Sequence, residues 1–268
     1  MILSRCRNVI GGNIDWQLNE IRIMQMSLEE VRSQLAPTGV LRAAINMGNF
    51  LLVTGKTPNG DPDGVSPDMA RELARRIGVD CKLVPFDTPG ELADAAANDV
   101  WDIGNIGAEP ERAKTIAFTA AYVEIEATYL VPAGSSIQSI EDVDQAGNRI
   151  AVSARSAYEL WLSDNIKNAE LKLAQGLDGS FDLFVEEKFE ALAGLRPRLI
   201  SDVEKLPGAR ILDGQFTAVQ QAMGTKPDRI EAAAYMREFV EELKINGFVK
   251  GLIEKHGVVG RLSVAPAV

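Results

Sequence analysis

The stretch VSPDMARELARRIGVDCKLVPF, residues 65–86, decides the class of fold because it reads as a helix followed directly by a strand. Met69, Leu73 and Ile77 recur at helical spacing, and charged residues fill most positions between them. Gly78 is typical of a helix end, and a short apolar run follows it. We therefore expect a helix over residues 65–78 and a strand over residues 79–86.

The same alternation continues on both sides of this stretch. VLRAAIN at 40–46 and VWDIGNIG at 100–107 have the character of strands, and PGELADAAAND at 89–99 has the character of a helix. Alternating β and α units imply a mostly parallel sheet with helices on its faces. The sequence thus predicts an α/β fold, and its 268 residues leave room for one large domain or two small ones.

Composition excludes several classes of function. The chain is 46% hydrophobic and 25% charged, as in ordinary water-soluble globular proteins. A net charge of −10 argues against nucleic acid as a partner, because such binding needs clustered Lys and Arg. No apolar run approaches the roughly 20 residues that cross a bilayer.

PERAKTIAFTAAY, residues 110–122, resembles the signature of the bacterial extracellular solute-binding proteins of the polar amino-acid uptake family. Arg112 matches the family's arginine, and Lys114, Phe118, Thr119 and Tyr122 follow in register. Residues 123–152 resemble the family's crossover strand, serine turn, Leu-x-Asp-Leu helix and the strand that opens its second lobe. The tail at 238–257 resembles its two closing helices, with Gly247 between them.

The resemblance implies a two-lobed type II periplasmic-binding-protein fold with two hinge crossovers. Lobe 1 is expected over 38–124 and 216–268, lobe 2 over 125–215, and an N-terminal extension over 1–37. The crossover segments are rich in β-branched and aromatic residues, which favours a hinge of paired strands over a flexible tether.

The resemblance also implies a non-enzymatic protein that closes over a small ligand, with Arg112 gripping a carboxylate. A guanidinium suits this task because its planar fork of donors fits a carboxylate bidentately. Ser156 stands at a predicted helix start, where free N–H groups attract anions, and it is expected to cap the helix, to contact the ligand, or both. Arg155 replaces a family glycine and adds a second positive charge.

Other candidates follow from strand ends, because ligands of open α/β sheets bind at the carboxyl ends of the strands. The residues expected to line the cleft on this basis, or from the hinge, are Asn46, Asn49, Phe50, Asn105, Gln220 and Gln221. Where the family carries an aspartate for the ligand's ammonium group, the alignment places Leu195, with Arg196 next. This loss favours a ligand that is more anionic than an ordinary amino acid, although a zwitterion stays possible.

Two rival functions remain open. The family's fold also hosts dehydratases of the cyclohexadienyl type, and Glu109, Glu124 and Glu126 are the acids that could serve as general acid or base. A ligand-sensing module is the third possibility.

Metal and cofactor sites have little support in the sequence. With one histidine, His256, and two cysteines, Cys6 and Cys81, no zinc site of the usual nitrogen and sulfur ligands can be assembled. His256 is expected to be structural. No phosphate-binding glycine motif follows a strand, so no nucleotide cofactor is predicted.

The resemblance implies a periplasmic monomer that delivers its ligand to an ABC-type permease. However, the N-terminal residues lack the continuous apolar segment of a signal peptide. We therefore expect that translation starts at Met26 or, alternatively, that the protein is cytoplasmic.

Overall fold

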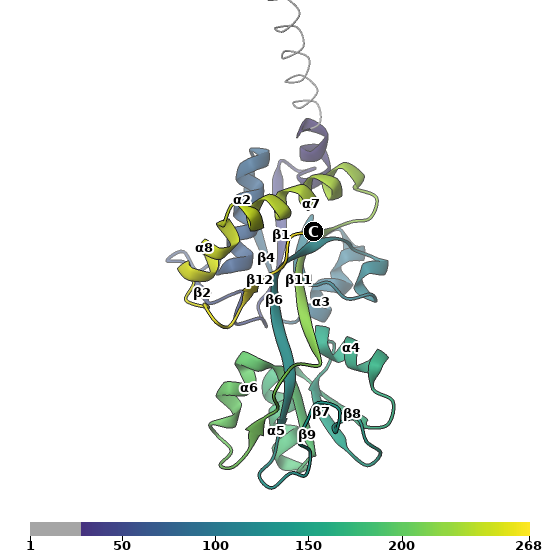
Figure 1. Cartoon of the computed structure of the whole chain (residues 1–268). Coiled ribbons are helices and arrows are strands. Elements are labelled where there is room, and N and C mark those ends of the chain that lie inside the picture. Colours follow the sequence, from purple (N-terminus) through teal and green to yellow (C-terminus); the bar gives the residue numbers. More distant parts are fainter. Residues whose placement is uncertain (1–27) are drawn as a thin grey trace, which may run out of the picture.

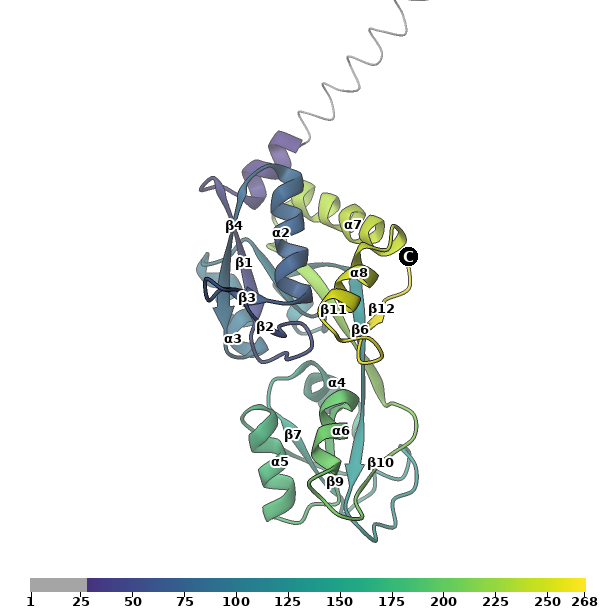
Figure 2. The ribbon, with the colours of Figure 1, turned by 90° about the vertical axis from the view of Figure 1, so that its left-hand side faces the viewer.

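The computed structural model describes residues 28–268, and these form two lobes joined by two long strands (Figures 1 and 2). Its order of elements confirms the predicted α/β class with two hinge crossovers. The expected start at Met26, and Cys6, lie outside the described residues. Among the described residues no helix is both long and apolar enough to cross a membrane.

Lobe 1 carries the N-terminal and C-terminal parts of the described chain. Its strands are β1 (Val40–Asn46), β4 (Asp80–Phe86), β5 (Ile103–Gly107) and the short β2 (Gly55–Lys56), β3 (Pro62–Asp63) and β12 (Ser263–Val264). Its helices are α2 (Val65–Ile77), α3 (Pro89–Asp94), α7 (Ile230–Ile245) and α8 (Phe248–Lys255), with 3₁₀ turns η1 (Ala95–Asn98) and η2 (Arg112–Lys114).

Lobe 2 repeats the same layered plan on a smaller scale. Its strands are β7 (Arg149–Ser153), β8 (Glu170–Ala174), β9 (Ala191–Leu195) and β10 (Arg210–Ile211). Its helices are α4 (Ala157–Asn165), α5 (Gly176–Glu186) and α6 (Arg196–Val203).

The hinge consists of β6 (Ala117–Val131) and β11 (Thr217–Thr225), which run between the lobes as an antiparallel pair (Figure 2). They join both lobes into one sheet of order β4-β1-β5-β11-β6-β9-β7-β8. Each lobe has a parallel core of three strands, β1 with β4 and β5 in lobe 1 and β7 with β8 and β9 in lobe 2. The carboxyl ends of the parallel strands therefore face the gap between the lobes.

The sequence that decided the fold behaves as predicted. α2 buries Met69, Leu73 and Ile77, which are all fully inaccessible to solvent, against the sheet. Gly78 ends the helix in the left-handed conformation, with φ of 71°, which glycine adopts without steric cost. The expected helix over 65–78 and strand over 79–86 are thus present in lobe 1 as α2 and β4.

Two local expectations differ from the structure. The helix expected over 89–99 ends at Asp94, and a 3₁₀ turn follows, up to Asp99 with its left-handed φ of 51°. The helix that the resemblance implied near 140–143 is a set of turns. There the Asp142 carboxylate accepts the backbone N–H groups of Gln138 and Ser139, and such local side-chain bonds compete with a short helix.

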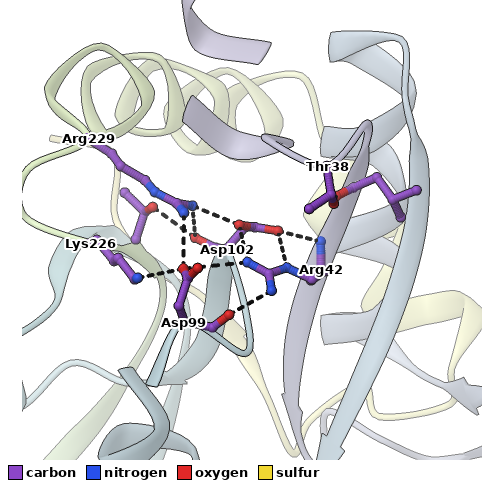
Figure 3. Close-up of polar contacts among 8 residues, drawn as sticks. Thr38, Arg42, Asp99, Asp102, Lys226 and Arg229 are labelled. Carbon is purple, nitrogen blue, oxygen red and sulfur yellow. Dashed lines mark hydrogen bonds and ion pairs between the residues drawn. The ribbon is translucent and has the colours of Figure 1, made fainter. Parts of the chain in front are cut away.

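A buried ion-pair network fixes the end of lobe 1 that lies away from the cleft (Figure 3). Asp102 is fully buried just before β5, where Arg42 binds both of its oxygens at 2.9 Å and Arg229 binds one at 3.0 Å. Asp99 and Lys226 extend the network at the surface. Because Arg42 lies on β1 and Arg229 caps α7, the network ties the first strand to the last part of the chain.

Candidate functional site

A cavity of about 110 Å³ lies between the lobes and receives residues from both. Lobe 1 contributes the loops after β1 and β4 and the end of β5, lobe 2 contributes the end of β7 and the starts of α4 and α5, and β11 contributes hinge residues. The polar side chains of its lining are those of Asn46, Asn49, Asp87, Thr88, Arg112, Ser153, Ser156, Tyr158 and Gln221. Strand ends and a helix N-terminus thus converge on one space.

Arg112 is a buried positive charge in this lining. Its side chain extends from η2, and the residue is only 5% exposed. The guanidinium donates to the carbonyl of Gly107 at 2.8 Å and, across the cleft, to the carbonyl of Arg155 at 2.9 Å. Burial lowers the pKa of Arg112 to about 10, against the opposing attraction of Glu109. Its hydrogen-bond partners in the described chain are neutral, so its charge is poorly compensated.

Ser156 is the N-cap of α4, as predicted. Its hydroxyl accepts the backbone N–H of Glu159 at 3.1 Å. The residue also lines the cavity, so the start of α4 faces the same space as Arg112. A ligand contact for Ser156 remains a prediction.

Arg155 does not line the cavity, although the sequence placed its charge beside the ligand. It adopts a left-handed φ of 58°, and its guanidinium turns to lobe 1, where it binds Asp94 at 2.6 and 2.8 Å. Its backbone N–H is held by Glu159 at 2.8 Å. The positive charge is thereby neutralised away from the cavity.

Arg196 and Gln220 also lie outside the cavity lining. Arg196 opens α6 and binds Glu126 at 2.6 Å and the carbonyl of Gly214, so it braces the hinge. Gln220 binds Glu124 at 3.0 Å. Successive residues of a strand point to opposite faces, so its neighbour Gln221 is the one that lines the cavity.

The candidates after β1 and on β5 divide into two groups. Asn46 and Asn49 line the cavity, whereas Phe50 lies outside it, with the Arg261 guanidinium 5.4 Å from its ring centroid. Asn105 is 1% exposed and does not line the cavity, and neither amide atom has a hydrogen-bond partner in the described chain.

The sequence did not single out Asp87 and Tyr158, and it named Gln221 only together with Gln220. Asp87 directly follows β4, so the strand-end rule that selected Asn46 would also have selected it. Tyr158 lies in the first turn of α4 and is buried, which raises its pKa to about 12. Gln221 is 4% exposed, and its side-chain oxygen Oε1 has no hydrogen-bond partner within residues 28–268.

The three acids of the enzymatic alternative have different surroundings. Glu124 and Glu126 lie on hinge strand β6, where Glu124 accepts a hydrogen bond from Gln220 and Glu126 accepts one from Arg196. Glu109 is buried, which raises its pKa to about 7, while Arg112 opposes the rise. None of the three lines the cavity.

His256 belongs to a separate cluster in lobe 1. Its Nε2 lies 2.9 Å from Asp68, and Asp63 is the third member of a group with suitable spacing for a cation. Lys255 and Arg71 already bind Asp68 at 2.6 and 2.9 Å. These contacts favour the structural role expected for His256.

Known proteins share both the sequence and the fold. The model of the bacterial extracellular solute-binding proteins, family 3, matches residues 48–259. Cyclohexadienyl dehydratase of Pseudomonas aeruginosa is 28% identical over 170 residues, which cover 59% of this chain and 63% of that enzyme. The L-cystine-binding protein TcyJ of Escherichia coli is 22% identical over 202 residues, covering 74% of this chain and 75% of TcyJ.

Among solved structures, an ancestral amino acid-binding protein described as a precursor of cyclohexadienyl dehydratase has a TM-score of 0.67 at 21% identity. The aligned part covers 85% of this chain and 98% of that one. The fold and the cleft define a two-lobed type II periplasmic binding protein. The chain belongs to the bacterial extracellular solute-binding proteins, family 3, a family that includes amino-acid-binding components of ABC transporters.

Proposed function

We propose that this protein binds a small carboxylate-bearing metabolite, an amino acid or a close relative, between its lobes and delivers it to an ABC-type permease. The observation that carries the proposal is Arg112, a guanidinium buried in the cavity lining with neutral carbonyls as its hydrogen-bond acceptors. These two bonds use two of its five N–H donors. A ligand carboxylate would supply the charge that the site lacks.

The charges of the lining favour the zwitterionic alternative over a strongly anionic ligand. Arg155 and Arg196, the extra positive charges that supported an anion, lie outside the lining and are paired with Asp94 and Glu126. The lining instead holds one cation, Arg112, and one acid, Asp87. Asp87 forms no ion pair within residues 28–268. A guanidinium and a free carboxylate together suit a ligand that carries both charges.

A thermal-shift screen tests the function directly. It compares L-amino acids with their deaminated 2-oxo acids and with dicarboxylates, so that each amine has a matched counterpart. We expect at least one amino acid to raise the melting temperature, and its 2-oxo acid to do so less. A screen in which dicarboxylates alone stabilise the protein would refute the zwitterion argument, and a screen with no carboxylate hit would refute the assigned site.

The remaining features of the proposal follow from the family. As family members are extracellular or periplasmic, we propose the periplasm as the site of action and a monomer as the delivering form. Immunoblots of osmotic-shock and cytoplasmic fractions would separate this from the cytoplasmic alternative.

A dehydratase-like enzyme is the second candidate, favoured by the sequence match to cyclohexadienyl dehydratase and by Glu109, whose raised pKa of about 7 suits general acid or base catalysis. Against it, the titratable residues of the lining are Asp87, Arg112 and Tyr158, and the last two do not titrate near neutrality, because the pKa of Arg112 stays at about 10 even after burial lowers it and burial raises the pKa of Tyr158 to about 12. Incubation with prephenate decides between the two, because only an enzyme would consume it.

A further inference from the structure

We propose that Arg155 is a positioning residue that closes the cleft without touching the ligand. Its guanidinium holds helix α3 of lobe 1, its carbonyl holds Arg112, and the closed arrangement is therefore populated before any ligand binds. The inference depends on the two-lobed fold and not on the identity of the ligand.

The first support is the ion pair that joins the lobes. Arg155 stands between β7 and α4 in lobe 2, and both of its terminal nitrogens bind Asp94, the last residue of α3, at 2.8 and 2.6 Å. A third contact reaches the carbonyl of Gly90 at 3.4 Å. The paired geometry is bidentate, which is the stronger form of such a contact.

The second support is the hydrogen bond from Arg112. One guanidinium nitrogen of Arg112 donates to the carbonyl of Arg155 at 2.9 Å. The proposed ligand-binding arginine is thus oriented by the same residue that carries the ion pair. Opening the lobes would separate both contacts together.

The third support is the room left for this approach by two glycines. A Cβ at Gly90 would stand 2.9 Å from Cζ of Arg155, and a Cβ at Gly107 would stand 2.8 Å from Cβ of Ala157. Both distances are shorter than real side chains tolerate. At these two positions the absence of a side chain therefore lets lobe 1 approach Arg155 and Ala157 of lobe 2 closely.

The fourth support is the left-handed backbone conformation of Arg155. A non-glycine residue with φ of 58° is unusual, and the conformation persists here because Glu159 holds the Arg155 N–H at 2.8 Å. Glycine would fit this turn with less strain but would lack the guanidinium that binds Asp94.

Solvent limits how strongly the ion pair between Arg155 and Asp94 can favour the closed form. The side chains of Arg155 and Asp94 are 55% and 64% exposed, so screening limits the ion pair to at most about a fivefold change in the ratio of closed to open protein. The effect should weaken as salt rises.

Small-angle X-ray scattering of the ligand-free full chain tests the proposal. The variants are Arg155→Gly, Asp94→Asn and the exchange Asp94→Arg with Arg155→Asp, and Arg75→Gln, which removes an ion pair within α2, is the matched control. At low salt we expect a larger radius of gyration for the two single variants, recovery in the exchange, and no change in the control. High salt should expand the parent protein toward the single variants.

Identical radii for the parent protein, Arg155→Gly and Asp94→Asn at low salt would overturn the proposal. Arg155→Gly relieves the left-handed strain and so should fold at least as well as the parent, and Asp94→Asn alters an exposed helix end. Since no ligand is present, failure here would leave the proposed binding function standing, and failure of the ligand screen would leave this proposal standing.

Discussion

Replacing Arg112 with methionine should weaken ligand binding strongly while leaving the fold almost as stable as before. Methionine keeps the length of the buried stem and deletes the charged fork. The fall in the pKa of Arg112 from its ordinary value to about 10 corresponds to roughly 3 kcal/mol of unfavourable charge burial. A ligand carboxylate that relieves this cost would gain a similar amount. We therefore expect the Kd to weaken by about two orders of magnitude.

The stability of the ligand-free variant provides an independent check on this reasoning. Arg112→Met loses two hydrogen bonds to carbonyls but also removes a poorly compensated buried charge. These effects oppose each other, so the free energy of unfolding should change by only about 1 kcal/mol.

The assay is calorimetric titration with the strongest hit of the ligand screen, together with urea unfolding of the ligand-free proteins. Arg112→Lys, which keeps the charge but not the fork, should fall between the parent protein and Arg112→Met. An Arg112→Met protein that binds the ligand as tightly as the parent would refute the role of this residue. A variant destabilised by several kcal/mol would show that Arg112 is mainly structural.

Three further predictions concern other charges. Burial raises the folded-state pKa of Glu109 from 4.5 to about 7, so its contribution to stability is present below pH 4.5 and is lost as the pH rises through 7. The melting temperature of the parent protein should therefore exceed that of Glu109→Gln by a margin that shrinks from pH 4.5 to 7. A margin that stays constant would contradict this prediction. Asp102→Asn should cost about 3 kcal/mol or more in urea unfolding, because Arg42 and Arg229 both lose the charge of their fully buried partner. Asp99→Asn should cost clearly less because Asp99 is exposed, and equal losses would show that burial is not decisive. Asp87→Asn should reduce the preference for an amino acid over its 2-oxo acid in the thermal-shift assay, and an unchanged preference would exclude Asp87 as the amine partner.

The fold could be predicted to a large extent because its signals are local. The spacing of Met69, Leu73 and Ile77 indicates one buried helix face, and Gly78 and Gly247 mark ends that need positive φ. The pairing of β6 with β11 was also predictable from the β-branched composition of the crossovers. The turns near 140–143 were not, because one carboxylate, that of Asp142, redirects the backbone there.

The candidate site was harder to predict because its charges depend on contacts between distant segments. Arg155 and Arg196 look alike in sequence as cations beside the cleft, yet each has an acid within reach from another element, Asp94 in α3 and Glu126 in β6. Sequence spacing does not reveal such pairs. The choice of Gln221 over Gln220 turned on strand register, since one residue reverses the face of a strand.

A crystal structure of the protein with the strongest hit of the ligand screen is the most direct test of the central claim. We predict electron density for the ligand between the lobes, with its carboxylate oxygens about 2.7 to 2.9 Å from the guanidinium nitrogens of Arg112. A ligand bound elsewhere, or an Arg112 side chain that still contacts only the carbonyls of Gly107 and Arg155, would contradict the account.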